Sequence, residues 1–343
     1  MRYINTTKMA HILPTRNSLL STTIDGNEVF DSNTINIDLS KVGGIQKFKE
    51  IEIGRYEVIN LIRIYALGDL IQLVPIARYL KNQGICKQVQ ITTSNRFLSS
   101  LKRIFPDILF STVKNISNDV LKINLNSILE HDHSLKNKER NLHRVHIYAN
   151  FLNIKDRIHL DWSSRMKEKD GKCFINEEDN VIAVQIRGSG SIKTLPFDFI
   201  KKMCKRIAKQ NKVILIDHDS NYGFEGDNII NACGKMGVLD IVRTLENCKC
   251  VITMDSGILW LAHVAKCPVI TFLGSTREHE RISLHPLYPH KAKSINLSQE
   301  VGCEPCFETK IYCEGKIRCM NEFNYDTIIK KVLNNLEIIL SEV

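Results

Sequence analysis

The sequence predicts an α/β protein with two domains, each built around a parallel sheet. Short apolar runs alternate with amphipathic helical patterns from Val58 onward, and such alternation is typical of parallel strands covered by helices. The alternation stops in a charged stretch at 155–179 and starts again at Asn180. The 343 residues are also enough to form two separate hydrophobic cores.

The first domain is predicted to span residues 56–165 and to follow an N-terminal extension. Residues 1–55 are polar, with short strand patterns at 27–30 and 35–39 and no convincing helix. The predicted order after them is strand, helix, strand and long polar helix, at 58–66, 69–83, 88–93 and 128–152. The last pattern carries several histidines among lysines and arginines, which indicates a solvated basic face rather than metal ligands. These are His131, His133, His143 and His146.

Residues 166–179 are predicted to link the first domain to a second one at 180–322. Strands are expected at 180–187, 212–217, 249–254 and 268–274, and helices at 197–210, 238–247 and 257–266. Residues 323–343 form one more amphipathic helix, which we expect to pack back on the N-terminal domain. Open α/β sheets bind ligands at the carboxyl ends of their strands, so both domains are expected to contribute to one cleft.

The overall composition excludes disordered and fibrous classes, since 43% of the residues are apolar and 25% are charged. The longest apolar runs, such as 264–274, are too short to cross a bilayer, and the first residues lack the apolar region of a signal peptide. We therefore expect a cytoplasmic protein, and peripheral contact with the inner membrane stays open. The net charge of +9 indicates an anionic partner, such as a nucleotide, a phosphorylated lipid or a membrane surface.

One candidate catalytic residue follows the first predicted strand of the first domain. Leu67-Gly68-Asp69 ends that strand, and a helix begins at once. Gly68 permits a tight turn, and Asp69 occupies the expected N-cap position. Asp69 is either a simple helix cap or a carboxylate that points into the cleft as a general base.

Three loops of the second domain carry candidate ligand-binding residues. The loop 187–193 has two glycines and two serines between Arg187 and Lys193, which indicates a phosphate cradle or a flexible polar loop. Asp217 and Asp219 follow a strand, where a carboxylate can accept ribose hydroxyls. The turn at 255–257 leads directly into a helix, whose backbone N–H groups and positive end suit a phosphate.

A cysteine cluster follows these loops. Of the 11 cysteines, Cys303, Cys306, Cys313 and Cys319 lie close together in the sequence and begin with a C-x-x-C pattern. Four thiols at this spacing suit a tetrahedral zinc or iron site. Reduced thiols without a metal are the alternative, and the remaining cysteines are interpreted as core thiols.

Two segments resemble glycosyltransferase family 9, the ADP-heptose heptosyltransferases. They are IRIYALGDLIQLVPIARYLK, around Asp69, and VITMDSGILWLAHVAKCPVITFLG, around Asp255. The resemblance covers residues 58–335 and implies the GT-B fold, in which two Rossmann-like domains face a central cleft. It also implies inverting transfer of a heptose-like sugar from an ADP-sugar to an acceptor hydroxyl, without a catalytic cofactor.

The same resemblance implies roles for individual residues. Asp69 would be the general base. The donor-binding set would be Arg187, Ser191, Lys193, Asp217, Asp219, Met236, Asp255, Ser256 and Gly257. Within this set Lys193 would hold the diphosphate, and either Asp217 or Asp219 would hold the ribose. Met236, in the segment Lys235-Met236-Gly237, would contact adenine through its main chain, although a methionine is more often core filler.

Trp260 is a departure from the lipopolysaccharide heptosyltransferases, many of which have histidine at that position. The segment Ser256-Gly257-Ile258-Leu259-Trp260 is similar to that of the autotransporter heptosyltransferases, whose cysteine clusters bind iron. The acceptor therefore stays open between a protein and the lipopolysaccharide core glycan. A structural iron or zinc is implied at the cysteine cluster.

Two other classes of function compete with this interpretation. The first is a non-catalytic protein that binds nucleotide-sugars on the same fold. The second is a nucleic-acid binder, which rests on the charge of +9 alone and lacks interleaved aromatic and basic residues. No nucleic-acid partner is therefore predicted, and self-association into a homo-oligomer stays open.

Overall fold

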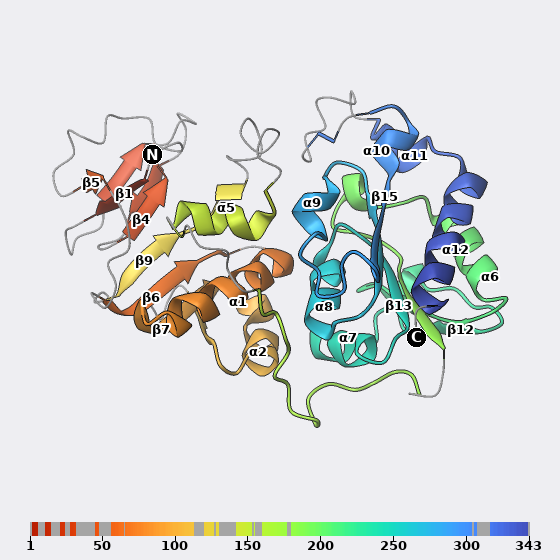
Figure 1. Ribbon diagram of the computed structural model, residues 1–343, viewed down its shortest axis with the longest axis horizontal. Coiled ribbons are helices and arrows are strands. Elements are labelled where there is room, and N and C mark those ends of the chain that lie inside the picture. The colour runs from red at the N-terminus through yellow and green to blue at the C-terminus, as the bar shows by residue number, and fades with distance from the viewer. Residues whose placement is uncertain are drawn as a thin grey trace. The chain divides into compact units, whose positions relative to one another are not determined.

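Each half of the chain folds around a sheet of its own. The computed structural model divides the chain into two compact units, residues 1–165 and 166–343 (Figure 1). The structure describes residues 2–5, 11–14, 21–24, 28–31, 45–47, 56–64, 66–112, 120–126, 128–129, 142–152, 154, 160–176, 180–303, 305–306 and 316–341, and up to residue 56 it describes the backbone alone. Within these residues no helix is long and apolar enough to span a membrane.

The sheet of the first unit has seven strands in the order β5-β1-β4-β9-β6-β7-β8. Four of them belong to the predicted first domain and run parallel: β6 (Tyr56–Ile62), β7 (Cys86–Thr93), β8 (Leu109–Thr112) and β9 (Leu121–Asn124). The extension adds β1 (Arg2–Asn5), β4 (Glu28–Asp31) and β5 (Ile45–Lys47). A separate hairpin pairs β2 (His11–Pro14) with β3 (Ser21–Ile24). The strand predicted at 27–30 is thus found as β4, whereas the one at 35–39 lies outside the described residues.

The helices of the first unit are α1 (Leu67–Asn82), α2 (Asn95–Ile104) and α5 (Arg144–Phe151). Helix α1 buries the apolar face that the sequence predicts, including Leu70, Leu73 and Leu80. The prediction of one continuous helix at 128–152 is wrong, because residues 142–143 are not helical and α5 begins at Arg144. Residues 130–141, with His131 and His133, lie outside the described residues. His143 is the N-cap of α5, and the His143 ring accepts a hydrogen bond from the N–H of Val145. His143 is buried rather than solvated.

The sheet of the second unit is wholly parallel, with the strand order β12-β11-β10-β13-β14-β15. Its strands are β10 (Val181–Gln185), β11 (Lys212–Ile216), β12 (Ile229–Asn231), β13 (Cys250–Met254), β14 (Val269–Leu273) and β15 (Ala292–Asn296). Four of the six match the predicted strands. The outer strands β12 and β15 are short or carry polar residues, and the sequence patterns miss them.

Helices surround this second sheet. The longer ones are α6 (Phe197–Ile207), α7 (Val238–Leu245), α8 (Gly257–Ala265) and α12 (Tyr325–Ser341). The short ones are α9 (Glu278–Arg281), α10 (Leu297–Glu300) and α11 (Arg318–Asn321). We expected α12 to pack on the N-terminal domain, but its apolar side chains join the core of the second unit, beside α6, β14 and β15 (Figure 1). An amphipathic pattern requires an apolar neighbour but does not say which one.

The residues predicted as a linker pack on the second unit. Arg243, on α7, donates a hydrogen bond to the carbonyl oxygen of Lys167 at 2.8 Å, and the N–H of Lys172 donates to Asp240 at 2.7 Å. Gly171 has a φ of 76°, and a Cβ there would lie 2.5 Å from the carbonyl oxygen of Leu239. Close contact with α7 therefore holds this segment.

Candidate functional site

Three loops of the second unit meet at the carboxyl ends of its central strands. The chain leaves β10 toward β11 and β12 on one side, and later returns to β13 and β14 on the other side. Ligands of open α/β sheets bind at such a reversal of strand order. The loops after β10, β11 and β13 carry most of the residues predicted to bind the donor: Arg187, Ser191, Lys193, Asp217, Asp219, Asp255, Ser256 and Gly257.

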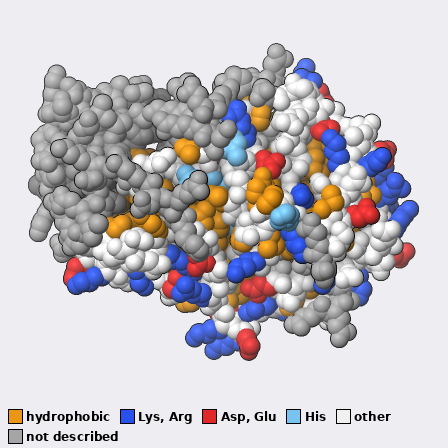
Figure 2. Space-filling model, in the orientation of Figure 1, with side chains coloured by type: hydrophobic (Ala, Val, Ile, Leu, Met, Phe, Trp, Pro, Cys, Tyr) orange, Lys and Arg blue, Asp and Glu red, His pale blue; other side chains and the backbone are white. Residues whose placement is uncertain are grey.

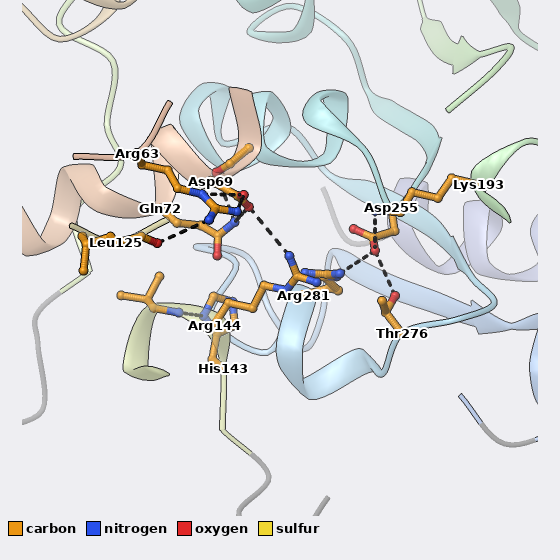
Figure 3. Close-up of polar contacts among 12 residues, drawn as sticks. Arg63, Asp69, Gln72, Leu125, His143, Arg144, Lys193, Asp255, Thr276 and Arg281 are labelled. Atoms are coloured by element: carbon orange, nitrogen blue, oxygen red, sulfur yellow. Dashed lines mark hydrogen bonds and ion pairs between the residues drawn. The ribbon is translucent and has the colours of Figure 1, made fainter. Parts of the chain in front are cut away.

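The Asp255 carboxylate gathers three side chains from different segments (Figure 3). One of its oxygens, Oδ2, lies 2.7 Å from Nη2 of Arg281 and 3.6 Å from Nζ of Lys193. The same oxygen accepts a hydrogen bond from the hydroxyl of Thr276 at 3.0 Å. Two cations around one carboxylate leave an excess of positive charge at this edge of the sheet, which suits an anionic ligand.

Ser256 joins the loops after β10 and β13. It is the N-cap of α8, and its hydroxyl oxygen accepts a hydrogen bond from the N–H of Ile258 at 3.2 Å. The Ser256 hydroxyl also donates to Oε1 of Gln185 at 2.7 Å, and the Gln185 amide donates to the carbonyl oxygen of Arg187 at 2.6 Å. The expected turn at 255–257 is present and leads into α8. Its serine holds two loops together.

The loop after β10 closes tightly on itself. A Cβ at Gly188 would lie 2.1 Å from the carbonyl oxygen of Lys193, and Gly190 has a φ of 92°. The Thr194 hydroxyl donates to the carbonyl oxygen of Gly190 at 2.9 Å. Lys193 ends a short 3-10 helix, Ser191–Lys193, in which Ser191 is exposed. The two glycines are therefore needed for a compact loop that carries Lys193 toward Asp255.

Arg187 pairs with Asp217, although the sequence suggests that Arg187 is a phosphate ligand. Its Nε and Nη2 donate to the two carboxylate oxygens of Asp217, at 3.0 and 2.8 Å. These hydrogen bonds raise the pKa of Arg187. The guanidinium carbon lies 3.3 Å from the centre of the Tyr222 ring. The donors that would grip a phosphate are mostly used by Asp217 instead.

The two candidate ribose carboxylates differ in exposure. The side chain of Asp217 has no exposed surface, whereas that of Asp219 is 33% exposed. Met236 is half-buried, just after Gly234, whose N–H donates to the carbonyl oxygen of Asp217 at 2.8 Å. The segment with Met236 therefore lies beside the end of β11.

Asp69 lies in the first unit, at the carboxyl end of β6. It is the third residue of α1, and the N-cap is Ala66, which has a φ of 62° and makes no side-chain cap. The interpretation of Asp69 as an N-cap is therefore wrong. Its carboxylate forms ion pairs with Arg63 and Arg144, the second at 3.7 Å, and lies 3.4 Å from the Gln72 amide nitrogen (Figure 3). Asp69 is thus a buried carboxylate held by two arginines.

Comparison with known proteins decides the family. A family model described as glycosyltransferase family 9 (heptosyltransferase) matches residues 148–316. This chain carries a glycosyltransferase family 9 domain. The matched residues of this family 9 domain include the three loops around Lys193, Asp217 and Asp255, whereas Asp69 and Cys319 lie outside them. No curated protein matches the chain.

Solved structures similar to this family 9 chain confirm the predicted GT-B fold. The iron-containing dodecameric glycosyltransferase TibC from enterotoxigenic E. coli H10407 has a TM-score of 0.61 at 14% identity, with 99% of this chain and 92% of that chain covered. A family 9 glycosyltransferase from Veillonella parvula has a TM-score of 0.60 at 15% identity, covering 84% and 99%. The E. coli ADP-heptose lipopolysaccharide heptosyltransferase II has a TM-score of 0.52 at 14% identity, covering 83% and 99%. Together with the family 9 domain at 148–316, this fold identifies the chain as a glycosyltransferase.

Trp260, on α8 of the family 9 domain, packs in the interior. It stacks on His263 with ring centres 4.9 Å apart, and His263 meets the His285 ring at 4.5 Å. All three side chains are buried. Burial lowers the pKa of His263 to about 4. His263 is therefore a neutral core histidine.

Part of the cysteine cluster of the family 9 chain lies within the described residues. Cys303 and Cys306 are half-buried and Cys319, on α11, is buried, whereas Cys313 lies outside the described residues. Arg318 lies beside Cys303, with Nη1 3.9 Å from its sulfur. The described side chains do not by themselves form a group of three metal ligands.

Four candidate functional residues were not predicted from the sequence patterns: Arg63, Arg144, Thr276 and Arg281. Thr276 reaches Asp255 across 21 residues of sequence. Arg281 lies on the short helix α9, which has no clear pattern of its own. Only Arg63 had a local signal, as a charged residue within an apolar run directly before the Asp69 turn.

Proposed function

We propose that this glycosyltransferase moves a heptose-like sugar from an ADP-sugar to an acceptor hydroxyl, with inversion at the sugar. The observation that carries the donor assignment is the convergence of Lys193 and Arg281 on Asp255 at the reversal of strand order. A nucleoside diphosphate needs positive charge at this edge of the sheet. A TibC structure in complex with ADP-D-beta-D-heptose, with a TM-score of 0.58 to this chain, supports the choice of sugar.

The donor would lie along the three loops of the second unit. Lys193 and the amino end of α8, which Ser256 and Gly257 form, would hold the diphosphate. Asp217 and Asp219 follow β11, the next strand, and would face the ribose, with the exposed Asp219 as the more accessible acceptor of hydrogen bonds. Main-chain groups around Met236 would meet the base. A diphosphate stabilised in this way becomes a better leaving group.

Asp69 would take the proton from the acceptor hydroxyl as the hydroxyl oxygen attacks the anomeric carbon. The bond from that carbon to the diphosphate breaks on the opposite face, which inverts the configuration. Arg63 and Arg144 would hold the Asp69 carboxylate in one orientation. A fixed base within hydrogen-bond reach of the hydroxyl typically contributes factors of about 100 to 10,000 to the rate.

A structural iron or zinc forms part of the proposal. Cys303, Cys306, Cys313 and Cys319 would hold it as thiolates, a ligand set that suits either metal. The iron in TibC supports this assignment. Metal analysis of the purified chain tests it.

The acceptor is proposed to be a hydroxyl of a protein or of a lipopolysaccharide core glycan, in the cytoplasm. Self-association is also proposed, since TibC is dodecameric. On the face seen in Figure 2, basic and acidic side chains of the described residues are interspersed, which does not favour nucleic acid as the partner.

The test is a transfer assay with ADP-heptose and candidate acceptors, read by mass spectrometry of the acceptors. We expect wild-type protein to add the mass of one heptose and Asp69→Asn to lose at least about 100-fold in rate, while calorimetry shows unchanged ADP binding. Glu57→Gln, at an exposed surface ion pair, is the matched control. Full activity of Asp69→Asn would remove Asp69 from the mechanism. ADP binding without transfer to any acceptor would favour a non-catalytic nucleotide-sugar-binding protein.

A further inference from the structure

We infer that Arg187 recognises the base of the donor nucleotide, as a flat platform against which the base stacks. This inference rests on the proposed function, because it assumes that a nucleotide occupies the carboxyl edge of the second sheet. It assigns to Arg187 a role in choosing the nucleotide rather than in holding the phosphate.

The Arg187 guanidinium is held in one orientation. Its Nε and Nη2 are fixed on Asp217, whose side chain has no exposed surface. Nη2 also lies 3.5 Å from Asp219. Two parallel hydrogen bonds fix both the position and the plane of an arginine side chain. The Arg187 plane is therefore set by β11, the strand next to β10.

The Tyr222 ring supports one face of the Arg187 guanidinium. The guanidinium carbon lies 3.3 Å from the centre of the Tyr222 ring. Tyr222 in turn meets the edge of Phe197, with ring centres 6.2 Å apart, and Phe197 meets Phe224 at 5.9 Å. These partly buried rings join the core of the second unit. Tyr222 therefore cannot move away easily, and it covers one face of Arg187.

Part of the Arg187 side chain remains available to a ligand. The Arg187 side chain keeps 20% of its surface exposed, and Nη1 makes no hydrogen bond to the described residues. A guanidinium stacks on aromatic rings and bases through its face. Arg187 follows β10, at the start of the loop that leads to Lys193, and its partner Asp217 follows β11. A base that stacks on Arg187 would leave its ribose near Asp219 and its phosphates toward Lys193.

The test separates the contribution of the base from that of the phosphate. AMP and ribose 5-phosphate share the sugar and the phosphate and differ by the base, so calorimetric titration of both into one protein isolates the base. We expect wild-type protein to bind AMP about tenfold more tightly than ribose 5-phosphate, in the range known for stacking on a protein side chain. In Arg187→Lys, which keeps the charge but loses the plane, the ratio should fall to about twofold. Ribose 5-phosphate itself should bind both proteins alike.

Control variants distinguish a specific loss of base binding from a loss of folding. Arg206→Lys makes the same change at an exposed position of α6 and should leave the ratio unchanged. Tyr222→Leu removes the support and should lower the ratio, with folding checked by thermal unfolding. An unchanged ratio in folded Arg187→Lys, or an equal loss of both ligands, would overturn the inference while the donor proposal stands. Absence of any ADP or AMP binding to wild-type protein would overturn both.

Discussion

At the residue scale, Asp255 holds together cations from two segments that are distant in the sequence. Lys193 and Arg281 both approach Oδ2 of Asp255, and the Thr276 hydroxyl donates to the same oxygen. The carboxylate thereby keeps like charges close together that would otherwise repel each other. Such an arrangement fixes the position of Lys193 before a ligand arrives. Preorganised charge of this kind stabilises a leaving group without reorganisation.

Lys193→Met should therefore weaken both donor binding and transfer. We expect kcat/KM to fall by about 100-fold or more, because the leaving diphosphate loses a preorganised cation. Steady-state kinetics with ADP-heptose measures this. The matched control is Lys202→Met, since Lys202 forms an exposed ion pair with Asp326. Equal kinetics in the two variants would mean that Lys193 does not touch the donor.

At the residue scale, local sequence patterns do not predict which side chains pair with each other. Asp217 could be predicted because it ends a buried strand of a parallel sheet. Its bidentate bond to Arg187 could not, since 30 residues separate the two side chains. The same holds for Arg144, which reaches Asp69 from α5. Pairing at such distances depends on the strand order, which a single strand pattern does not contain.

At the element scale, helix α8 has its N-terminus at the edge of the sheet and carries a buried histidine. Ser256 and Gly257 begin the helix at the carboxyl edge of the sheet, whereas His263, one turn after Trp260, is fully buried. The Nδ1 atom of His263 lies 2.9 Å from the carbonyl oxygen of Leu259. Burial lowers the pKa of His263 from 6.5 to about 4, and burial also lowers that of His285.

The stability of the second unit should therefore fall in mild acid. Above pH 6.5 His263 is neutral in the folded and unfolded states, and its contribution is independent of pH. Between pH 6.5 and about 4 the unfolded chain binds a proton that the folded chain does not, so the free energy of unfolding drops by up to about 3 kcal/mol. Denaturant unfolding across this pH range measures the slope. His263→Gln should reduce this slope, while the buried His285 keeps its own contribution to it. His290→Gln, at an exposed histidine, is the control.

Most element boundaries of the second unit follow from its sequence. Strands β10, β11, β13 and β14 are apolar at all but one position each, which is typical of parallel strands covered on both faces. The long helix expected at 128–152 failed because His143 prefers to cap α5. A capping interaction of this kind depends on one side chain, and the periodicity of apolar residues does not reveal it.

At the scale of the whole molecule, the chain is two α/β units with different chemistry. The first carries a buried carboxylate with two arginines, Asp69 with Arg63 and Arg144. The second carries the loops at a reversal of strand order, with an excess of positive charge around Asp255. The repeated alternation of strands and helices made the two-domain fold predictable. The added strands β1, β4 and β5 were harder to predict, because short polar strands are defined by their neighbours.

The most direct test of the donor site is hydrogen exchange, measured by mass spectrometry with and without ADP-heptose. Bound ADP-heptose should slow exchange in four segments of the second unit: 187–193, 217–223, 234–237 and 255–258. Backbone amides that bind a ligand or lie beneath it exchange less readily. Protection confined to other residues, such as those that line the cavity of about 390 Å³ beside Arg78 and Asp107 in the first unit, would contradict the assignment of the donor site. No protection at saturating ADP-heptose would contradict the donor itself.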